Sequence, residues 1–261
     1  MQCVILCAGF ATRLYPLTRN VPKHLLPVAG RPVLDYVVER LAAVGIDRGV
    51  LVTNRTFVDQ FHGWAAKEPL AANLQILDDK ATSNENRLGS IGDLQFALTQ
   101  GGIQDDFLVV NGDNLFTFAL DGMLETFRRL GNTIALYDVG SESETAKMGV
   151  ADCDAVGRVI AFREKPPVPG TTVASIGIYV YRAEVRSLVD RYLAEGNSAD
   201  KTGSFVEWLH QEVPVFGHRI RAEDGLWFDI GSHEQYDESN RMLERLQQPQ
   251  RDNSLPPEPM S

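Results

Sequence analysis

The chain has 261 residues, of which 44% are hydrophobic and 23% are charged, and its formal net charge at pH 7 is −10. These proportions are typical of a globular protein and exclude a disordered, collagen-like or coiled-coil chain. The excess of acidic residues argues against a protein that binds nucleic acids or anionic membranes, because such binding depends on clustered cations.

Apolar runs stay well short of the roughly 20 residues that a membrane-spanning helix needs, so we expect no membrane partner. The three cysteines include no Cys-x-x-Cys pair. Cys3 and Cys7 fall within or just after an apolar run, where a thiol behaves as a small buried hydrophobic group. This use of cysteine predicts a reducing, cytoplasmic location.

The first half of the chain alternates apolar runs with amphipathic segments. Residues 2–7 predict a buried first strand, and a loop rich in Gly, Thr, Arg and Pro follows up to about Arg31. From Pro32, apolar residues recur at helical spacing, with Gly45 just past the end of the helix. Buried strands that alternate with helices predict a mostly parallel sheet covered on both faces. Further strands are expected at residues 49–53, 74–77, 107–110 and 133–139, and helices at 56–66, 90–99 and 121–130.

The second half is less regular and contains a Pro-rich segment at residues 166–170. We predict a single three-layer, Rossmann-like α/β domain over residues 1–247, with a mixed, mostly parallel sheet. Its two halves meet near residue 140, and the polar, Pro-rich residues 248–261 are expected to be disordered. Strands are expected at residues 157–162, 173–181 and 213–220, and helices at 183–194, 205–211 and 233–247.

The densest group of chemically useful residues lies in the loop after the first strand. Gly9 allows backbone N–H groups to approach phosphate oxygens, while Arg13 and Lys23 supply positive charge. Loops at the carboxyl ends of parallel strands are where α/β sheets bind ligands. The alternative is an ordinary surface loop with two solvated cations. Neither a P-loop string nor the G-x-G-x-x-G fingerprint occurs, which argues against a P-loop kinase and a nicotinamide oxidoreductase.

Two acidic residues stand at the ends of apolar runs. Asp113 closely follows the strand at 107–110, and Asp229 lies between Phe228 and Ile230 just before the last helix. Mg²⁺ prefers carboxylate and phosphate oxygens, so one or two acids and a phosphorylated substrate suffice to bind it. Asp113 has an alternative interpretation as an Asx-turn at a strand end, and Asp229 as the partner of a helix N-terminus.

Five short motifs occur in order along the chain, and together they resemble one family. The motifs are Gly9-x-x-Thr12-Arg13-Leu14 with Thr18 and Pro22-Lys23, then Gly112-Asp113, Glu164-Lys165-Pro166, Ser175-Ile176-Gly177-Ile178-Tyr179 and Trp227-x-Asp229-Ile230-Gly231. An exposed Glu–Lys pair has little meaning by itself, so the third of these motifs is informative only beside the others. This series resembles the sugar-1-phosphate nucleotidylyltransferases, which include the glucose-1-phosphate thymidylyl-, uridylyl- and adenylyltransferases. The resemblance covers about residues 1–240.

The resemblance implies a role for each matched position. Lys23 and Arg13 would be catalytic, with Lys23 stabilising charge on the α-phosphate, and Asp113 and Asp229 would hold Mg²⁺. The nucleotide would contact Ala8, Gly9, Phe10, Ala11, Thr12, Arg13, Asn84, Asn86 and Gly89. The sugar phosphate would contact Gly149, Glu164, Lys165, Gly177 and Trp227.

Three positions differ from the usual pattern of that family. Ala11 has a Cβ where glycine is usual, so its peptide has to adopt a conformation that is open to alanine. Phe10 is bulkier than the usual residue and is expected to cover the nucleotide. Asn84 falls near the place where some relatives read the base, so the sequence leaves the preferred base open.

The implied reaction is the Mg-dependent transfer of a nucleotidyl group from a nucleoside triphosphate to a sugar 1-phosphate, which gives an NDP-sugar and pyrophosphate. The resemblance also implies a homo-oligomer. An alternative acceptor within the class is a non-sugar phosphate, such as a cyclitol phosphate or phosphocholine. Alternatives from other classes are a non-catalytic nucleotide-sugar-binding or regulatory module and a related glycosyltransferase. Such glycosyltransferases typically carry Asp-x-Asp at the metal, whereas this chain has Asn111-Gly112-Asp113.

Overall fold

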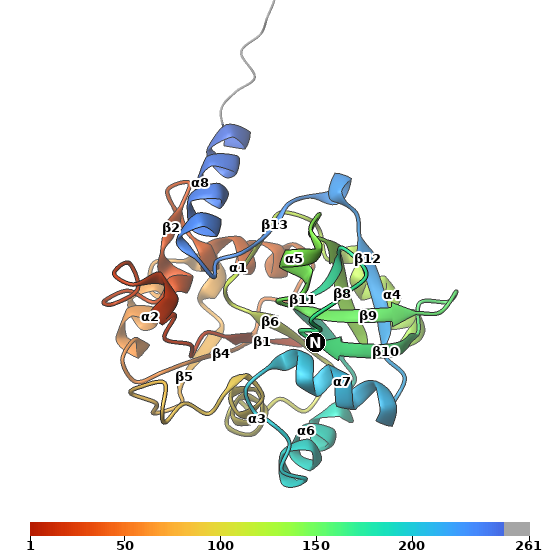
Figure 1. Ribbon diagram of the computed structural model, residues 1–261. Coiled ribbons are helices and arrows are strands. Elements are labelled where there is room, and N and C mark those ends of the chain that lie inside the picture. The colour runs from red at the N-terminus through yellow and green to blue at the C-terminus, as the bar shows by residue number, and fades with distance from the viewer. Residues whose placement is uncertain (248–261) are drawn as a thin grey trace, which may run out of the picture.

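A mixed nine-stranded β-sheet forms the centre of the molecule (Figure 1). The computed structural model describes residues 1–247, and the segment 248–261, predicted to be disordered, lies outside the described residues. The strands of the sheet are β1 (Gln2–Leu6), β4 (Gly49–Thr53), β5 (Leu74–Asp78), β6 (Phe107–Asn111), β8 (Thr133–Asp138), β9 (Gly149–Cys153), β10 (Val159–Glu164), β11 (Val173–Tyr181) and β12 (Phe216–Ile220). Their order is β10-β9-β11-β6-β1-β4-β5, with β8 paired to β11 and β12 paired to β8.

Helices cover both faces of this sheet. They are α1 (Val33–Ala43), α2 (Val58–Ala65), α3 (Ser90–Gln100), α4 (Asp121–Leu130), α5 (Glu142–Thr145), α6 (Val185–Ala194), α7 (Thr202–Glu212) and α8 (His233–Gln247). Cys3 and Ile5 of β1 belong to the apolar cluster that includes side chains of α1, α2 and α4. Val4 and Leu6 belong to the opposite cluster, with α3, α6 and α7. The predicted three-layer α/β architecture is confirmed by this arrangement. Of the helices in residues 1–247, none is long and apolar enough to span a bilayer.

The two halves of the sheet differ in strand direction. β5, β4, β1 and β6 run parallel to one another. β1, β4 and β6 are buried on both faces, which explains why each appears in the sequence as a continuous apolar run. β11 pairs antiparallel with β6 on one edge and with β8 and β9 on the other. The sheet is therefore mixed, and β11 joins its two halves.

Several short strands were absent from the sequence-based expectations. The strands β2 (Pro27–Val28) and β3 (Arg31–Pro32) form one small sheet, while β7 (Asn114–Phe116) and β13 (Trp227–Asp229) form another. Strands of two or three residues are too short to show the alternating pattern on which a sequence-based prediction relies. β9 was also missed, because much of it is exposed and polar. The remaining boundaries shift by a few residues, as at β12 and α7.

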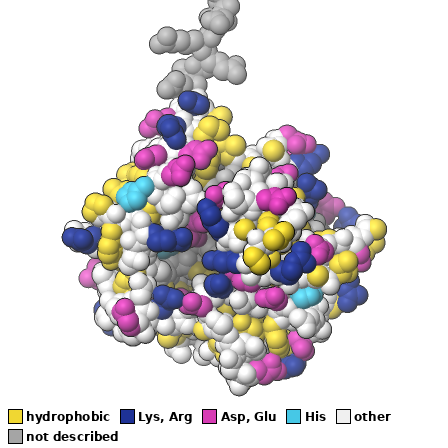
Figure 2. Space-filling model, viewed as in Figure 1, with side chains coloured by type: hydrophobic (Ala, Val, Ile, Leu, Met, Phe, Trp, Pro, Cys, Tyr) yellow, Lys and Arg dark blue, Asp and Glu magenta, His cyan; other side chains and the backbone are white. Residues whose placement is uncertain are grey.

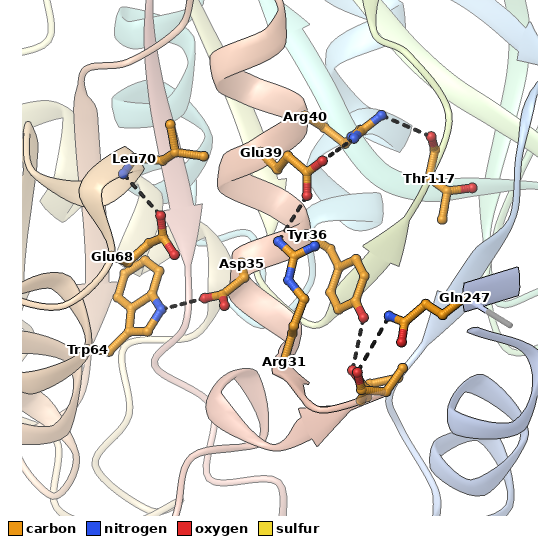
Figure 3. Close-up of polar contacts among 12 residues, drawn as sticks. Arg31, Asp35, Tyr36, Glu39, Arg40, Trp64, Glu68, Leu70, Thr117 and Gln247 are labelled. Carbon is orange, nitrogen blue, oxygen red and sulfur yellow. Dashed lines mark hydrogen bonds and ion pairs between the residues drawn. The ribbon is translucent and has the colours of Figure 1, made fainter. Parts of the chain in front are cut away.

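Polar side chains on α1 tie neighbouring segments together (Figure 3). Asp35 accepts a hydrogen bond from Trp64 Nε1 of α2 at 2.8 Å, and the Tyr36 hydroxyl donates to a carbonyl of β2 at 2.9 Å. Arg40 Nη1 donates to the Thr117 carbonyl, just after β7, at 3.3 Å. α1 therefore holds the end of the loop between β1 and α1 through β2, and it also holds α2 and the segment after β7.

A pair of buried carboxyl groups joins the end of β5 to the start of α3. Asp79 and Asp93 are 7% and 6% exposed, and Asp79 Oδ1 accepts a hydrogen bond from the Ala81 N–H at 2.7 Å. Burial, followed by the neighbouring charge of Asp79, raises the pKa of Asp93 to about 8. Burial and the neighbouring charge of Asp79 therefore favour a proton on Asp93 near neutral pH. This proton relieves the repulsion between the two segments.

Replacement of Asp93 by Asn should change how stability depends on pH. The folded protein holds a proton on this pair more tightly than the unfolded chain does, because the pKa of Asp93 is raised from 3.8 to about 8. The contribution to the free energy of unfolding is therefore complete below about pH 4 and is lost as the pH rises toward 8. Urea unfolding between pH 5 and 9 should show a shallower decline in Asp93→Asn than in the wild type; parallel profiles would contradict the raised pKa of Asp93.

Candidate functional site

A cavity of about 200 Å³ opens where the two halves of the sheet meet. Its walls come from the segment between β6 and β7, from β9, β10, β11 and β13, and from the start of α7. Figure 2 shows Lys and Arg side chains gathered around a hollowed region on this face. Seven of the residues singled out in the sequence line this cavity. They are Asp113, Gly149, Glu164, Lys165, Gly177, Trp227 and Asp229.

The pairing of β7 with β13 brings the two predicted acidic residues together. Asp229 pairs with Asn114 across the two strands, and the Ile230 N–H donates to the Asp113 carbonyl at 3.2 Å. Burial and then the negative charge of Asp113 raise the pKa of Asp229 to about 6. Two carboxyl groups that repel each other in one cavity wall could hold a divalent cation.

Lys23 supplies the positive charge closest to these acids. Its Nζ donates a hydrogen bond to Asp113 Oδ2 and forms an ion pair with it, and the two side chains are 13% and 22% exposed. Burial alone would raise the pKa of Asp113, but the neighbouring charges, that of Lys23 first, and the hydrogen bonds to the carboxylate together outweigh burial and lower the pKa. Arg13 also lies near enough for its charge to lower the pKa of Asp229. The structure thus brings both predicted cations and both predicted acids to one place.

The loop after β1 is held by hydrogen bonds to its backbone. Asn54 Nδ2 donates to the Ala8 carbonyl at 2.8 Å, and Thr18 Oγ1 donates to the Ala11 carbonyl at 2.8 Å. Gly9 is exposed, and a Cβ placed on it would meet no atom within 4 Å. The exposed segment beyond it includes Thr12, so the backbone here is accessible to a ligand.

The Phe10 side chain does not have the position expected from the sequence. It is 8% exposed and belongs to the core, where its ring centroid lies 6.4 Å from that of Phe57. The ring therefore packs inward instead of covering a nucleotide. Phe10 therefore anchors the loop to the core, and its ring is not exposed to a ligand.

The segment between β5 and α3, where a base was expected, mostly satisfies its own polar groups. Asn86 Oδ1 accepts hydrogen bonds from the N–H groups of Thr82 and Ser83, both at 3.0 Å. Asn84 Oδ1 accepts one from Arg87 at 3.3 Å. These asparagines do not line the cavity. Asn86 shapes the loop, and Asn84 is the less constrained of the two.

Position 89 requires glycine because of its backbone conformation and its close neighbours. Its φ is +81°, and a Cβ placed on it would lie 2.6 Å from the Ala199 carbonyl oxygen. The same carbonyl accepts a hydrogen bond from the Ile91 N–H at 2.8 Å. Gly89 therefore allows the start of α3 to pack against the loop before α7, whereas Ser90 beside it reaches the cavity wall.

Sequence reasoning missed the contribution of the start of α7 and of Asn114. Lys201, Thr202 and Gly203 line the cavity, but they follow a polar loop with no recognisable motif. Asn114 is 3% exposed, accepts a hydrogen bond from Trp227 Nε1 at 3.0 Å and donates to a carbonyl of β11 at 3.2 Å. The sequence offers one signal for Asn114, which directly follows the Gly-Asp of the second motif. A buried amide needs hydrogen-bond partners, so an Asn at this place indicates a polar contact with another segment.

Replacement of Ala11 by Gly should stabilise the protein. Ala11 has φ +48° and ψ +43°, a left-handed conformation that a Cβ disfavours. The gain from glycine is partly cancelled by the greater freedom of the unfolded chain, so the free energy of unfolding should rise by up to about 1 kcal/mol. Urea denaturation measures this change. Ala119→Gly, in an exposed loop outside the left-handed region, is the control and should destabilise; equal losses in both variants would disprove strain at Ala11.

Comparison with known proteins gives consistent matches. The family model described as "Nucleotidyl transferase" matches residues 2–245. A glucose-1-phosphate thymidylyltransferase of Streptomyces antibioticus is 32% identical over 191 residues, which cover 72% of this chain and 51% of that protein. A mannose-1-phosphate guanylyltransferase of Mycobacterium tuberculosis is 30% identical over 243 residues, which cover 90% of this chain and 62% of that protein.

The fold is likewise shared with a solved structure. The crystal structure of apo UDP-glucose pyrophosphorylase superposes with a TM-score of 0.78 at 18% identity, over 95% of this chain and 99% of that one. The chain spans between half and two thirds of the length of the curated relatives it matches. On the match of the family model to residues 2–245, the chain belongs to the nucleotidyl transferase family.

Proposed function

We propose that this chain transfers a nucleotidyl group from a nucleoside triphosphate to a sugar 1-phosphate, forming an NDP-sugar and pyrophosphate. The observation that carries the proposal is that Asp113 and Asp229 line one polar cavity, with Lys23 paired to Asp113. The relatives named above for such transferases support it. In this proposal, residues up to about 140 bind the nucleotide and residues 141–247 bind the acceptor.

The proposed nucleotide site is the loop after β1 together with the segment before α3. The backbone of residues 8–12, with Gly9 exposed, offers N–H groups to phosphate oxygens, and Arg13 adds charge. Asn84 and Asn86 are proposed to lie near the base, although Asn86 already accepts hydrogen bonds within its loop. These contacts do not determine which base is preferred.

Asp113 and Asp229 have the right chemistry for Mg²⁺. Both supply hard carboxylate oxygens, and the raised pKa of Asp229 shows that burial and the adjacent acid oppose a second negative charge there. A bound cation would relieve that repulsion. When bound, Mg²⁺ would supply positive charge to phosphate oxygens of the two substrates.

The residues of the chain would act by positioning and by electrostatics. An oxygen of the sugar phosphate, already anionic at neutral pH, attacks the α-phosphorus in line, and pyrophosphate leaves. Lys23 and Arg13 would stabilise the charge that develops on the phosphoryl oxygens. Because the attacking oxygen carries no proton, the reaction does not need a general base.

Unpartnered oxygens in the cavity favour an acceptor that carries hydroxyl groups. Asn111 Oδ1 and Ser175 Oγ are buried, line the cavity and have no hydrogen-bond partner among residues 1–247. Buried polar oxygens without partners are costly, and a small shift of either side chain toward the cavity would let a hydroxyl group of the acceptor satisfy them. The trimethylammonium group of phosphocholine has no hydrogen to donate, so this observation favours a sugar phosphate, with a cyclitol phosphate as the second candidate.

A homo-oligomer and a cytoplasmic location complete the proposal. The first rests on the family resemblance. The second rests on the absence of paired cysteines in the sequence, and it is supported by the free thiols of Cys3 and Cys7, which are both buried, and of Cys153.

Turnover of defined substrate pairs tests the proposal. Pyrophosphate release should appear with at least one of five nucleoside triphosphates combined with a sugar or cyclitol 1-phosphate, and not with phosphocholine. Addition of EDTA should stop the release, and excess Mg²⁺ should restore it. A protein that binds nucleotide but releases no pyrophosphate with any acceptor would instead be a non-catalytic binding module.

Lys23→Ala should nearly abolish turnover while the protein stays folded. Loss of one charged donor from an electrostatic site typically lowers the rate by about 10²–10³. Lys67→Ala, which removes an exposed lysine just after α2, is the matched control and should keep wild-type rates. Steady-state pyrophosphate release and circular dichroism on both variants decide the matter; a normal rate in Lys23→Ala would remove Lys23 from the proposed role.

A further inference from the structure

The Glu164 carboxylate lies between two glycines that come from separate parts of the fold. Gly149 begins β9, and Gly203 lies in the first turn of α7, while Glu164 ends β10. All three residues line the cavity. A Cβ on Gly149 would lie 3.2 Å from Glu164 Oε2, and a Cβ on Gly203 would overlap that oxygen and lie 2.8 Å from the carboxyl carbon. The carboxylate therefore occupies space that side chains at these positions would fill.

The backbone of Gly203 gives no other reason for glycine at this position. Gly203 is helical and does not have a positive φ. Glycine is a poor residue inside a helix because it leaves the unfolded chain more conformational freedom. Alanine would suit the helix better, so the space taken by Glu164 is the constraint that glycine satisfies.

The start of α7 is fixed firmly enough that it would not move aside for a Cβ. The Tyr179 hydroxyl of β11 donates a hydrogen bond to Thr202 Oγ1 at 3.1 Å. Phe205 is 1% exposed and packs edge-on against Tyr181 and Tyr192, with ring centroids 6.1 and 5.3 Å apart. In Figure 1, α7 runs beside β10, with which it is in contact. A Cβ at position 203 would therefore displace the flexible end of Glu164 and leave the helix in place.

The carboxylate is available to a ligand in its present position. Burial raises the pKa of Glu164, and the charges of Lys165 and Lys201 offset this only in part. Within residues 1–247, no hydrogen bond to the Glu164 carboxylate contributes to its pKa. The same cavity contains the unpartnered oxygens Asn111 Oδ1 and Ser175 Oγ. Two residues that line the cavity with Glu164 therefore also carry buried oxygens that lack partners.

We propose that Gly203 is a positioning residue that determines acceptor recognition, because it keeps the Glu164 carboxylate at the depth where it accepts hydrogen bonds from acceptor hydroxyls. The inference rests on the proposed function. It concerns the acceptor, because Gly203 and Glu164 line the cavity, whereas the loop after β1 that is proposed to bind the triphosphate does not.

The test is the kinetics of Gly203→Ala with the best substrate pair of the wild type. A hydrogen bond to a charged group typically accounts for a tenfold or larger change in affinity, so the KM for the sugar phosphate should rise about tenfold or more. The KM for the nucleoside triphosphate should stay within about twofold, which a general structural defect would not produce. Gly63→Ala is the control, because it also adds a Cβ in a helix and meets no atom within 4 Å.

A double-variant comparison separates positioning from misfolding. Glu164→Asp shortens the side chain by one methylene and withdraws the carboxylate from position 203. This variant should weaken the acceptor by itself, and Gly203→Ala should then add little further loss. Full additivity of the two changes would overturn the inference, as would an unchanged acceptor KM or an equal rise in both KM values in Gly203→Ala.

The outcome also distinguishes this inference from the proposed function. If the wild type turns over sugar phosphates but Gly203→Ala shows no selective effect, only the role of Gly203 fails. If the wild type neither turns over nor is stabilised against thermal unfolding by any sugar or cyclitol phosphate, the proposed function fails and the role of Gly203 fails with it.

Discussion

The antiparallel contact between β7 and β13 is the interaction on which the candidate site depends. It joins the end of the parallel half of the sheet to the segment before α8, and it places Asp229 beside Asn114 and close to Asp113. Two acids in a partly buried wall are costly unless positive charge compensates them. The ion pair of Lys23 with Asp113 supplies part of that compensation from the loop after β1. Lys23 therefore lowers the cost of both acids, and both acids in turn stabilise the charge of Lys23.

The mixed sheet explains why one cavity borders on both halves of the chain. β11 pairs with β6 of the parallel half and with β8 and β9 of the antiparallel half, so residues on β11 face both. Its register shifts between Ser175 and Tyr179, and Gly177 within this bulge has φ +71°. Added atoms at Gly177 would meet the amide groups of Asn111 and Asn114. The bulge thus creates the polar wall where the strand bends, as bulges near functional sites often do.

Sequence reasoning succeeded where a local pattern reports burial. The segments 49–53, 121–130 and 173–181 have the predicted bounds, because a continuous apolar run marks a strand buried on both faces and helical spacing marks a helix with one buried face. It failed at Phe10, whose size suggested a cover for a ligand although the ring packs on Phe57. It also missed β13, because a strand of three residues depends on its distant partner more than on its own pattern.

The sequence by itself determined the α/β class, the order of the motifs and the residue types available for phosphate and cation chemistry. The tertiary structure alone decided which of these residues meet: that Asp113 and Asp229 share a wall, and that Gly203 borders Glu164. The reason is physical. Periodicity records how each segment buries its own apolar side, whereas a contact between remote segments depends on the strand order, the register and the packing of the whole chain.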